Sequence, residues 1–216
     1  MSSTSSRKPS LRELQKEAGR AHISEAAGLL FLQEGYAKTT VRDIARAAGV
    51  AEGTIYNLFG DKATLLIEAL KRRLIEALKN RAPSAPHDLQ TILAGMDAAA
   101  TGSDIIDRFV EHDLEVAMQA TGMARLLLEA AALDPIVAEH WRRQEEARFE
   151  SQQWIIDVLE QRGFLREDRP REELARFLWM TVSPETWVKV IDSGISRDVL
   201  QEWKAETLKS VLLKAD

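Results

Sequence analysis

The chain has 216 residues, of which 45% are hydrophobic and 29% charged, a composition typical of a globular protein. It contains no cysteine, which excludes thiol catalysis, cysteine-ligated zinc and disulfides. No apolar run approaches the roughly 20 residues of a membrane span, and the N-terminus MSSTSSRKPS lacks the apolar block of a signal peptide, so we expect a cytoplasmic protein with no membrane partner.

The net charge of −5 hides a difference between the two parts of the chain. Residues 1–82 hold 14 Lys and Arg against 9 Asp and Glu, whereas residues 83–216 hold 15 against 25. A basic first part followed by an acidic remainder predicts that the first part meets a polyanion and the second does not.

A serine-rich tail at residues 1–9 precedes the first predicted helix. Ser10 and Glu13 have the spacing of a capping box, in which each side chain bonds the backbone of the other residue. Gly35 marks the end of this helix, since glycine favours helix termination. Apolar residues repeat at helical spacing between these limits, and we expect them to be buried: Ile23, Ala26, Ala27, Leu30 and Phe31.

A second, shorter helix is predicted after Thr40, because Thr40 and Asp43 form another capping-box pair. Gly49 ends this helix. Its apolar residues fall on one face, which we expect to be buried: Val41, Ile44, Ala45 and Ala48.

The turn Gly49-Val50 leads into a third helix of about eight residues, which Gly60 closes. Its inner face carries Ile55, Leu58 and Phe59, and its outer face carries Glu52, Gly53, Thr54, Tyr56 and Asn57. Asp61 then caps a long fourth helix that reaches about residue 81. The inward residues of this helix are predicted to be Leu65, Leu66, Ala69, Leu70 and Leu74.

The stretch RAPSAPHD interrupts the helical pattern with two prolines, so we place a domain boundary near residue 83. The first domain is then residues 10–82 and the second is residues 83–216. Signals for strands are missing, which predicts an all-α fold. We expect helices in the second domain at 88–100, 104–120, 122–132, 135–162, 171–192 with a kink or break at Pro184, and 196–214.

A short helix, a glycine turn and a second short helix with a small, polar and aromatic outer face are typical of a helix-turn-helix motif, here at about residues 40–59. Gly53 and Thr54 keep the third helix slim enough for the major groove, and hydroxyl groups suit phosphate oxygens. Lys62 in the first turn of the next helix also favours a phosphate. The predicted DNA-binding residues are Thr40, Arg42, Glu52, Gly53, Thr54, Tyr56, Asn57 and Lys62.

The same spacing also fits a three-helix bundle whose polar residues are merely solvated, because this geometry occurs in folds that never bind DNA. The motif residues favour the first interpretation. The segments EAAGLLFLQEGYAKTTVRDIARAAGV and AEGTIYNLFGDKATLL resemble the N-terminal domain of the TetR family of bacterial transcriptional regulators. The family pattern TT-x-x-x-IA-x-x-AGV-x-x-GT-x-Y-x-x-F-x-x-K-x-x-L is filled here by Thr39, Thr40, Ile44, Ala45, Ala48, Gly49, Val50, Gly53, Thr54, Tyr56, Phe59, Lys62 and Leu65.

The resemblance implies an all-helical homodimer with two DNA-binding heads and a larger domain for dimerisation and a small-molecule effector. No cofactor is expected. Two places depart from the family pattern: Ala51 and Glu52 stand where a serine and a basic residue are common, and Asn57 and Leu58 replace a tyrosine and a histidine or tyrosine. Glu52 can accept a bond from cytosine or repel phosphates, and Asn57 can read adenine or reach a phosphate. These departures concern the base sequence rather than the docking mode.

The second domain holds two sets of candidate residues. The middle helices, where the resemblance places an effector pocket, carry Phe109, His112, Met118, Met123, Leu127, Trp141 and Trp154, for which plain core packing is the alternative. Residues 171–214 carry apolar stripes that exceed what one subunit can hide. We therefore expect a dimer interface that includes Leu174, Leu178, Trp187, Leu200, Trp203 and Val211.

One polar cluster, Glu111, His112, Asp113 and Glu115, suggests a metal site. His112 and Glu115 share a helix face but Asp113 points elsewhere, so a solvated polar face is the better interpretation, with an effector bond from a buried His112 as an alternative. We predict no metal. No Gly-rich phosphate loop, zinc signature or nucleophile elbow occurs, so no catalytic residue is assigned.

The sequence thus predicts a homodimeric transcriptional regulator, a repressor that a small molecule releases from a palindromic operator in double-stranded DNA. The main alternative is a helix-turn-helix protein that acts through protein partners or nucleoid organisation, without an effector. A helical enzyme is a third possibility, since fold alone does not fix function.

Overall fold

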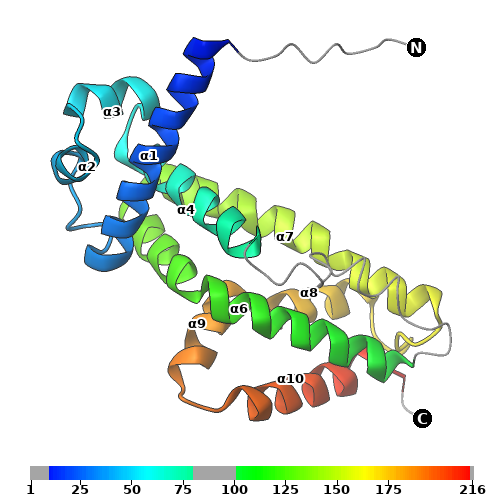
Figure 1. Ribbon diagram of the computed structural model, residues 1–216. Coiled ribbons are helices and arrows are strands. Elements are labelled where there is room, and N and C mark those ends of the chain that lie inside the picture. Colours follow the sequence, from blue (N-terminus) through cyan, green and yellow to red (C-terminus); the bar gives the residue numbers. More distant parts are fainter. Residues whose placement is uncertain (1–9, 80–100, 215–216) are drawn as a thin grey trace, which may run out of the picture. The chain divides into compact units, whose positions relative to one another are not determined.

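The structure of the protein is a computed structural model that describes residues 10–79 and 101–214 (Figure 1). Within these ranges every regular element is a helix, apart from one isolated bridge between Leu165 and Leu213. The predicted all-α fold is therefore confirmed. None of the described helices is both long and apolar enough to cross a bilayer.

The chain divides into two compact units, Met1–Glu76 and Ala77–Asp216. The predicted boundary near residue 83, the linker RAPSAPHD and the helix expected at 88–100 lie outside the described residues. The tail at 1–9 also lies outside them. The predicted domain limits therefore stay predictions.

The first unit contains α1 (Leu11–Glu34), α2 (Val41–Ala48), α3 (Glu52–Phe59) and the larger part of α4 (Lys62–Lys79). Ser10 caps α1 as predicted, with both bonds of the capping box present. The predicted inner faces of α1 to α3 and of the first turns of α4 meet in one core, where large apolar side chains are fully buried. The largest of them are Ile23, Phe31, Ile44, Ile55, Leu65 and Leu66.

One predicted core residue of α4 is not buried. Leu74 is 39% exposed, whereas Leu70 one turn earlier is buried. Arg73 takes the position against α1, since a Cβ added to Gly28 would lie 2.8 Å from the Cδ of Arg73. Successive residues of a helix are turned by about 100°, so Leu74 points away from this contact.

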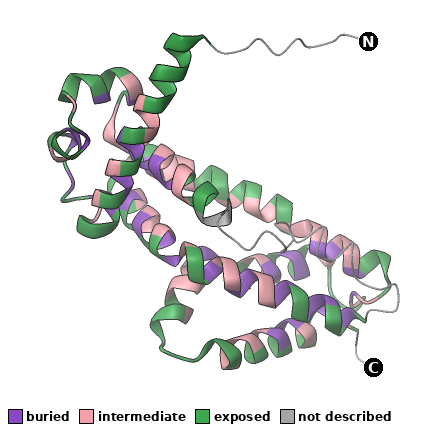
Figure 2. Cartoon of the chain, viewed as in Figure 1, coloured by how far each residue is buried: buried purple, intermediate pink, exposed green. Residues whose placement is uncertain are grey.

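The second unit contains α6 (Gly102–Leu133), α7 (Pro135–Gln161), α8 (Arg171–Thr181), α9 (Pro184–Asp192) and α10 (Arg197–Leu212). The helix α6 packs against α7, α9 and α10, and α7 packs against α8. Figure 2 shows buried residues alternating with exposed ones along α6, as expected for a helix with one face in a core. That core includes Ile105, Ile106, Leu114, Ile155, Ile156, Leu159, Leu178 and Leu208.

The structure corrects one helix boundary in this unit. Two helices were predicted at 104–120 and 122–132, but α6 runs without interruption through Thr121 and Gly122. The hydroxyl group of Thr121 donates to the carbonyl oxygen of Ala117, which satisfies it within the helix. Burial of Thr121 and Ala124 stabilises the continuous helix, so tertiary packing outweighs the weak helix propensity of threonine and glycine.

The other helix ends follow the predicted signals. Pro135 opens α7, and Gly163, with φ 76°, follows its end. Pro184 separates α8 from α9, and Ser183 caps α9 by accepting from the backbone N–H of Thr186. Of the kink or break predicted at Pro184, the structure shows a break, with one helix ending at Thr181 and the next beginning at Pro184.

Candidate functional site

The helix α2 is held at both ends by the residues that the sequence singled out. Thr40 accepts from the backbone N–H of Asp43 at 3.1 Å and donates its hydroxyl group to the Asp43 carboxylate at 2.5 Å. Arg46 pairs with the same carboxylate at 2.7 Å. Gly49 ends α2 in the left-handed conformation, with φ 66°, which glycine adopts without strain. These local bonds fix the turn from which α3 begins.

The helix α3 has one buried face and one exposed face. Ile55 and Phe59 anchor it in the core, with Leu58 half-buried beside them. Tyr56 is 50% exposed, and the other outward residues are also exposed, namely Glu52, Gly53, Thr54 and Asn57. The structure thus brings the five predicted base-contacting and phosphate-contacting residues of α3 together on one surface.

Gly53 is not required by the packing of the chain. A Cβ built on this residue meets no atom within 4 Å, and its φ lies outside the left-handed region. Glycine inside a helix costs about 0.5 to 1 kcal/mol relative to alanine. The open space beside Gly53 therefore allows another molecule to approach the backbone of α3 closely.

Arg20 of α1 holds the C-terminal end of α3, a role that the sequence did not reveal. Its guanidinium donates to the carbonyl oxygen of Leu58, pairs with Glu68 of α4 and lies 4.5 Å from the centroid of the Phe59 ring. Arg20 and Glu68 are 48 residues apart, so no local pattern signals their contact.

Lys62 has a structural role besides the predicted phosphate contact. Its ammonium group donates to the carbonyl oxygens of Tyr36 at 2.9 Å and Thr39 at 3.2 Å. The same group lies 4.0 Å from the centroid of the Tyr36 ring. Lys62 therefore ties the start of α4 to the turn that leads into α2, and the predicted phosphate contact stays a prediction.

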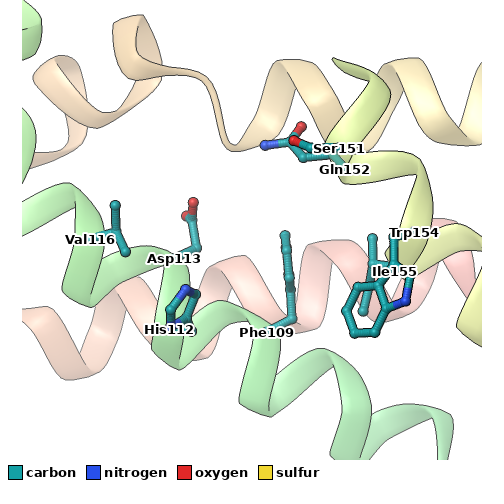
Figure 3. Close-up of a pocket in the computed structure, with 8 residues that line it drawn as sticks. All are labelled: Phe109, His112, Asp113, Val116, Ser151, Gln152, Trp154 and Ile155. Carbon is teal, nitrogen blue, oxygen red and sulfur yellow. The ribbon is translucent and has the colours of Figure 1, made fainter. Parts of the chain in front are cut away.

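The second unit contains a cavity of about 230 Å³ between α6 and α7 (Figure 3). From α6 it is lined by Phe109, His112, Asp113 and Val116, and from α7 by Ser151, Gln152, Trp154 and Ile155. Its walls are mostly apolar, with a few polar groups. Such a lining suits a small organic molecule with an apolar body and one or two polar groups.

Only part of the predicted effector pocket lines this cavity: Phe109, His112 and Trp154 do. Met118 is 54% exposed, because nine residues after Phe109 amount to about two and a half helical turns and place it on the opposite face of α6. Met123 and Leu127 of α6, and Trp141 of α7, are not among the lining residues. At a rise of 1.5 Å per residue they lie about 20 Å or more along their helices from Phe109 and Trp154.

Asp113 forms a buried network that corrects the interpretation of its cluster as a solvated face. Its carboxylate accepts from the ammonium group of Lys204 of α10 at 2.5 Å and from the indole N–H of Trp187 of α9 at 3.2 Å. Burial raises the pKa of Asp113, and the Lys204 ammonium group beside it opposes that rise. The wall of the cavity on α6 is thereby bonded to both α9 and α10.

The predicted dimer residues fall into two groups. Leu174 and Leu178 lie in the core of their own unit, and Leu200 and Val211 pack against it. Trp187 is half-buried and bonded to Asp113, whereas Trp203 is 55% exposed. Other exposed apolar residues of this part of the chain are Met180, Ile191 and Ile195.

Metal binding finds no geometric support in the part of the chain that the structure describes. No three His, Asp or Glu side chains gather there closely enough to hold an ion. The carboxylate of Asp113 is directed to Lys204 and Trp187.

Comparison with known proteins supports the DNA-binding interpretation of the first unit. Residues 23–69 match the family model of bacterial regulatory proteins of the tetR family. The match spans α2, α3, the second half of α1 and the first part of α4, and so includes the whole exposed face described above.

Two relatives of known role show different extents of similarity. The HTH-type transcriptional repressor KstR2 of Rhodococcus jostii is 28% identical over 179 residues, which cover 81% of this chain and 79% of the relative. The HTH-type transcriptional regulator TtgR of Pseudomonas putida is 46% identical over 68 residues, which cover 31% of this chain and 32% of the relative. The stronger identity is thus confined to a short segment, and the weaker one extends over most of both chains.

A solved structure shares the fold across both units. The crystal structure of NalD, the secondary repressor of the MexAB-OprM multidrug efflux pump in Pseudomonas aeruginosa, has a TM-score of 0.64 at 23% identity. The alignment covers 93% of this chain and 100% of NalD. These relatives are transcriptional regulators, so they favour a DNA-binding regulator over a protein that acts mainly through protein partners.

Proposed function

The chain belongs to the TetR family of bacterial regulatory proteins and is a DNA-binding transcriptional repressor, and we propose that two copies of it hold a palindromic operator until a small molecule releases them. The proposal places the protein in the cytoplasm, where bacterial DNA lies. It assigns no catalytic role, since binding equilibria alone account for such regulation.

The observation that carries DNA binding is the exposed face of α3. Gly53 leaves space that the fold itself does not use, and Thr54, Tyr56 and Asn57 surround it with hydrogen-bonding groups. We propose that α3 enters the major groove, with Glu52 and Asn57 at base edges. Thr54 and Tyr56 then meet phosphates, together with Thr40, Arg42 and Lys62.

For the dimer, we propose an interface formed by the exposed apolar residues of α8 to α10, with Trp203 at its centre. Leu174 and Leu178 support this surface from within the core instead of crossing it. The test is Trp203→Glu, which places a charge on an exposed side chain and so spares the fold. We expect monomers in sedimentation experiments, and a dimer that persists would place the interface elsewhere.

For control, we propose that an effector occupies the cavity between α6 and α7. A cavity of about 230 Å³ is small among ligand sites, which are commonly about 300 to 1,000 Å³, so the effector is a small molecule. A palindromic operator requires its two half-sites about 34 to 36 Å apart. A modest change in the separation of the two heads therefore weakens docking of the second head.

The helix α4 provides a route between the two events, because it begins at Lys62 and ends at Lys79, beyond the last residue of the first unit. We propose that a tilt of α4 carries the change from the cavity to the DNA-binding unit. Linkage then requires that DNA weakens effector binding by the same factor as the effector weakens DNA binding.

The experiment starts by sequencing the DNA that co-purifies with the protein, from which an operator duplex is made. Compounds are then screened for release of the fluorescent duplex, and each active compound is titrated by calorimetry with and without operator. We expect weaker compound binding in the presence of DNA. Equal affinities in the two titrations would exclude this mechanism for that compound.

A pair of variants locates the effector. Val116→Phe fills the cavity from α6, whereas Met118→Phe adds a ring on the opposite, exposed face of the same helix. We expect the first variant to bind DNA but to lose its response to the compound, and the second to behave as the wild type. A full response of Val116→Phe would move the effector site away from this cavity.

A further inference from the structure

The first turns of α1 lie outside the segment that matches the family model. The match begins at Ile23, whereas α1 begins at Leu11. Residues 11–18 are exposed, and Figure 2 shows the N-terminal turns of α1 mostly in the colour of exposed residues. Their helical structure is nevertheless fixed, by the capping box at Ser10 and by the ion pair of Glu17 with Arg72 of α4.

Two cations of this segment continue the buried face of α1. Arg12 and Lys16 precede Ile23 by eleven and seven residues, and both separations bring them to within about 20° of the direction of Ile23. Ile23 is fully buried in the core of the first unit, but Arg12 and Lys16 are exposed. Thus the side of α1 that faces the core changes from apolar residues to cations where the core ends.

These cations have no ion-pair partner within the described part of the chain. Neither Arg12 nor Lys16 takes part there in a hydrogen bond or an ion pair of its side chain. The two acidic residues nearby are engaged: Glu13 accepts from the backbone N–H of Ser10 at 2.7 Å, and Glu17 pairs with Arg72. The exposed positive charge therefore suits an external anion.

The contacts of Arg20 place this segment beside α3. Arg20 follows Lys16 by one helical turn and bonds the carbonyl oxygen of Leu58 at the C-terminal end of α3. At a rise of 1.5 Å per residue, Lys16 lies about 6 Å and Arg12 about 12 Å further along α1. In Figure 1 the first turns of α1 extend past α3 within the same unit. The major groove is about 12 Å wide, so a duplex docked on α3 has a phosphate backbone within the distance of about 6 to 12 Å that Lys16 and Arg12 span along α1.

We propose that Arg12 and Lys16 bind backbone phosphates at the flank of the half-site that α3 occupies. The inference rests on the proposed DNA binding of α3 and adds a second contact surface to it. Because α1 is already helical here, the contact costs less conformational entropy than one made by a flexible arm. The contact reads no bases, so it strengthens binding to every sequence alike.

The test is the salt dependence of binding to a random-sequence duplex, measured for the wild type and for the double variant Arg12→Gln/Lys16→Gln. Glutamine has nearly the same helix propensity as the residues that it replaces, so α1 is retained. Each lost phosphate contact lowers the slope of log K against log salt concentration by about 0.9. We expect the slope to fall by about two units for the double variant, equally on a second duplex of unrelated sequence.

Two controls distinguish a contact from a general effect of charge. Lys71→Gln removes an exposed lysine from α4 of the same unit, and we expect it to keep the wild-type slope. Leu14→Lys, added to the double variant, returns a charge on the face of α1 opposite Ile23, since nine residues amount to two and a half turns. We expect it not to restore the slope.

A double variant with the wild-type slope would overturn the inference, and so would restoration of the slope by Leu14→Lys. A wild-type protein that binds no duplex at low salt would instead overturn the proposed function of α3, and the inference with it. The wild-type titration separates these two failures. Thermal unfolding of each variant, expected to match the wild type, confirms that the fold is intact.

Discussion

Polar side chains are placed differently on α3 and at the cavity between α6 and α7. On α3, Glu52, Thr54 and Asn57 are exposed to solvent. At the cavity, Asp113 is buried and bonded to α9 through Trp187 and to α10 through Lys204. The first surface can therefore change without cost to the fold, whereas a change at the second alters the packing of three helices. Four predictions test this difference.

The largest effect is expected for Lys204→Met, which removes one partner of the buried pair. Loss of one member of such a pair costs about 3 to 5 kcal/mol, because the other charge stays buried without compensation. Urea unfolding at one fixed protein concentration measures the loss. The double variant Asp113→Leu/Lys204→Met, which removes both charges, is expected to lose much less. If Lys204→Met unfolded at the wild-type urea concentration, Asp113 would not depend on this contact.

Replacement of Glu52 or Asn57 by alanine should change DNA recognition and leave the stability of the fold unchanged. We expect each variant to change the preferred base at one operator position by about 1 to 3 kcal/mol. The free energy of unfolding should stay within about 0.5 kcal/mol of the wild type, because both side chains are exposed. Selection from a random duplex library measures the preference. A variant that weakens all sequences equally would show that its side chain contacts a phosphate instead.

Lys62 combines a structural role with a proposed DNA contact. Lys62→Ala should therefore reduce both the stability of the fold and DNA binding. Loss of its bonds to the carbonyl oxygens of Tyr36 and Thr39 is expected to cost about 1 to 2 kcal/mol of unfolding free energy. Loss of a phosphate contact is expected to lower the salt slope by about one unit on all duplexes. Denaturation and binding are measured separately. An altered base preference with an unchanged slope would contradict the phosphate contact.

The smallest effect concerns the cap of α2. The hydroxyl group of Thr40, foremost, and the neighbouring cations hold the pKa of Asp43 below its ordinary value of 3.8. A lowered pKa in the folded state stabilises the protein above pH 3.8, and this contribution is lost as the pH falls through the folded-state pKa. An NMR titration of the Asp43 carboxyl group should show the low pKa, and Thr40→Ala should raise it. If the titration midpoint of Asp43 were unchanged in Thr40→Ala, the neighbouring arginines would be the cause of its lowered pKa.

The helices of the first unit were predictable because their signals are local. Thr40 caps a helix three residues from Asp43, and Gly49 ends it, so each boundary depends on neighbours in sequence. The exposed face of α3 followed from periodicity once Ile55 and Phe59 were assigned to the core. Arg20 was missed, since its contacts with Leu58 and Glu68 arise only when α1, α3 and α4 pack together.

The second unit was harder for the same physical reason. Asp113 and Lys204 are 91 residues apart, and a buried carboxylate has the same sequence signature as a solvated one. The break predicted at Thr121 was wrong because burial of that part of α6 outweighs local propensity. The cavity is lined by Phe109, His112 and Trp154 but not by Met118. The side chain of Met118 points to the opposite face because α6 continues without a break from Phe109 to Met118.

The open space at Gly53 bears on how mutations of the protein would behave in a cell. The fold accepts a side chain at this position, and alanine would strengthen α3. A subunit with that change would accumulate normally and pair with unaltered subunits, yet its α3 would sit too far from the bases to dock. In the proposed dimer each mixed pair then has one competent head, so the altered gene copy would act dominantly over the intact one.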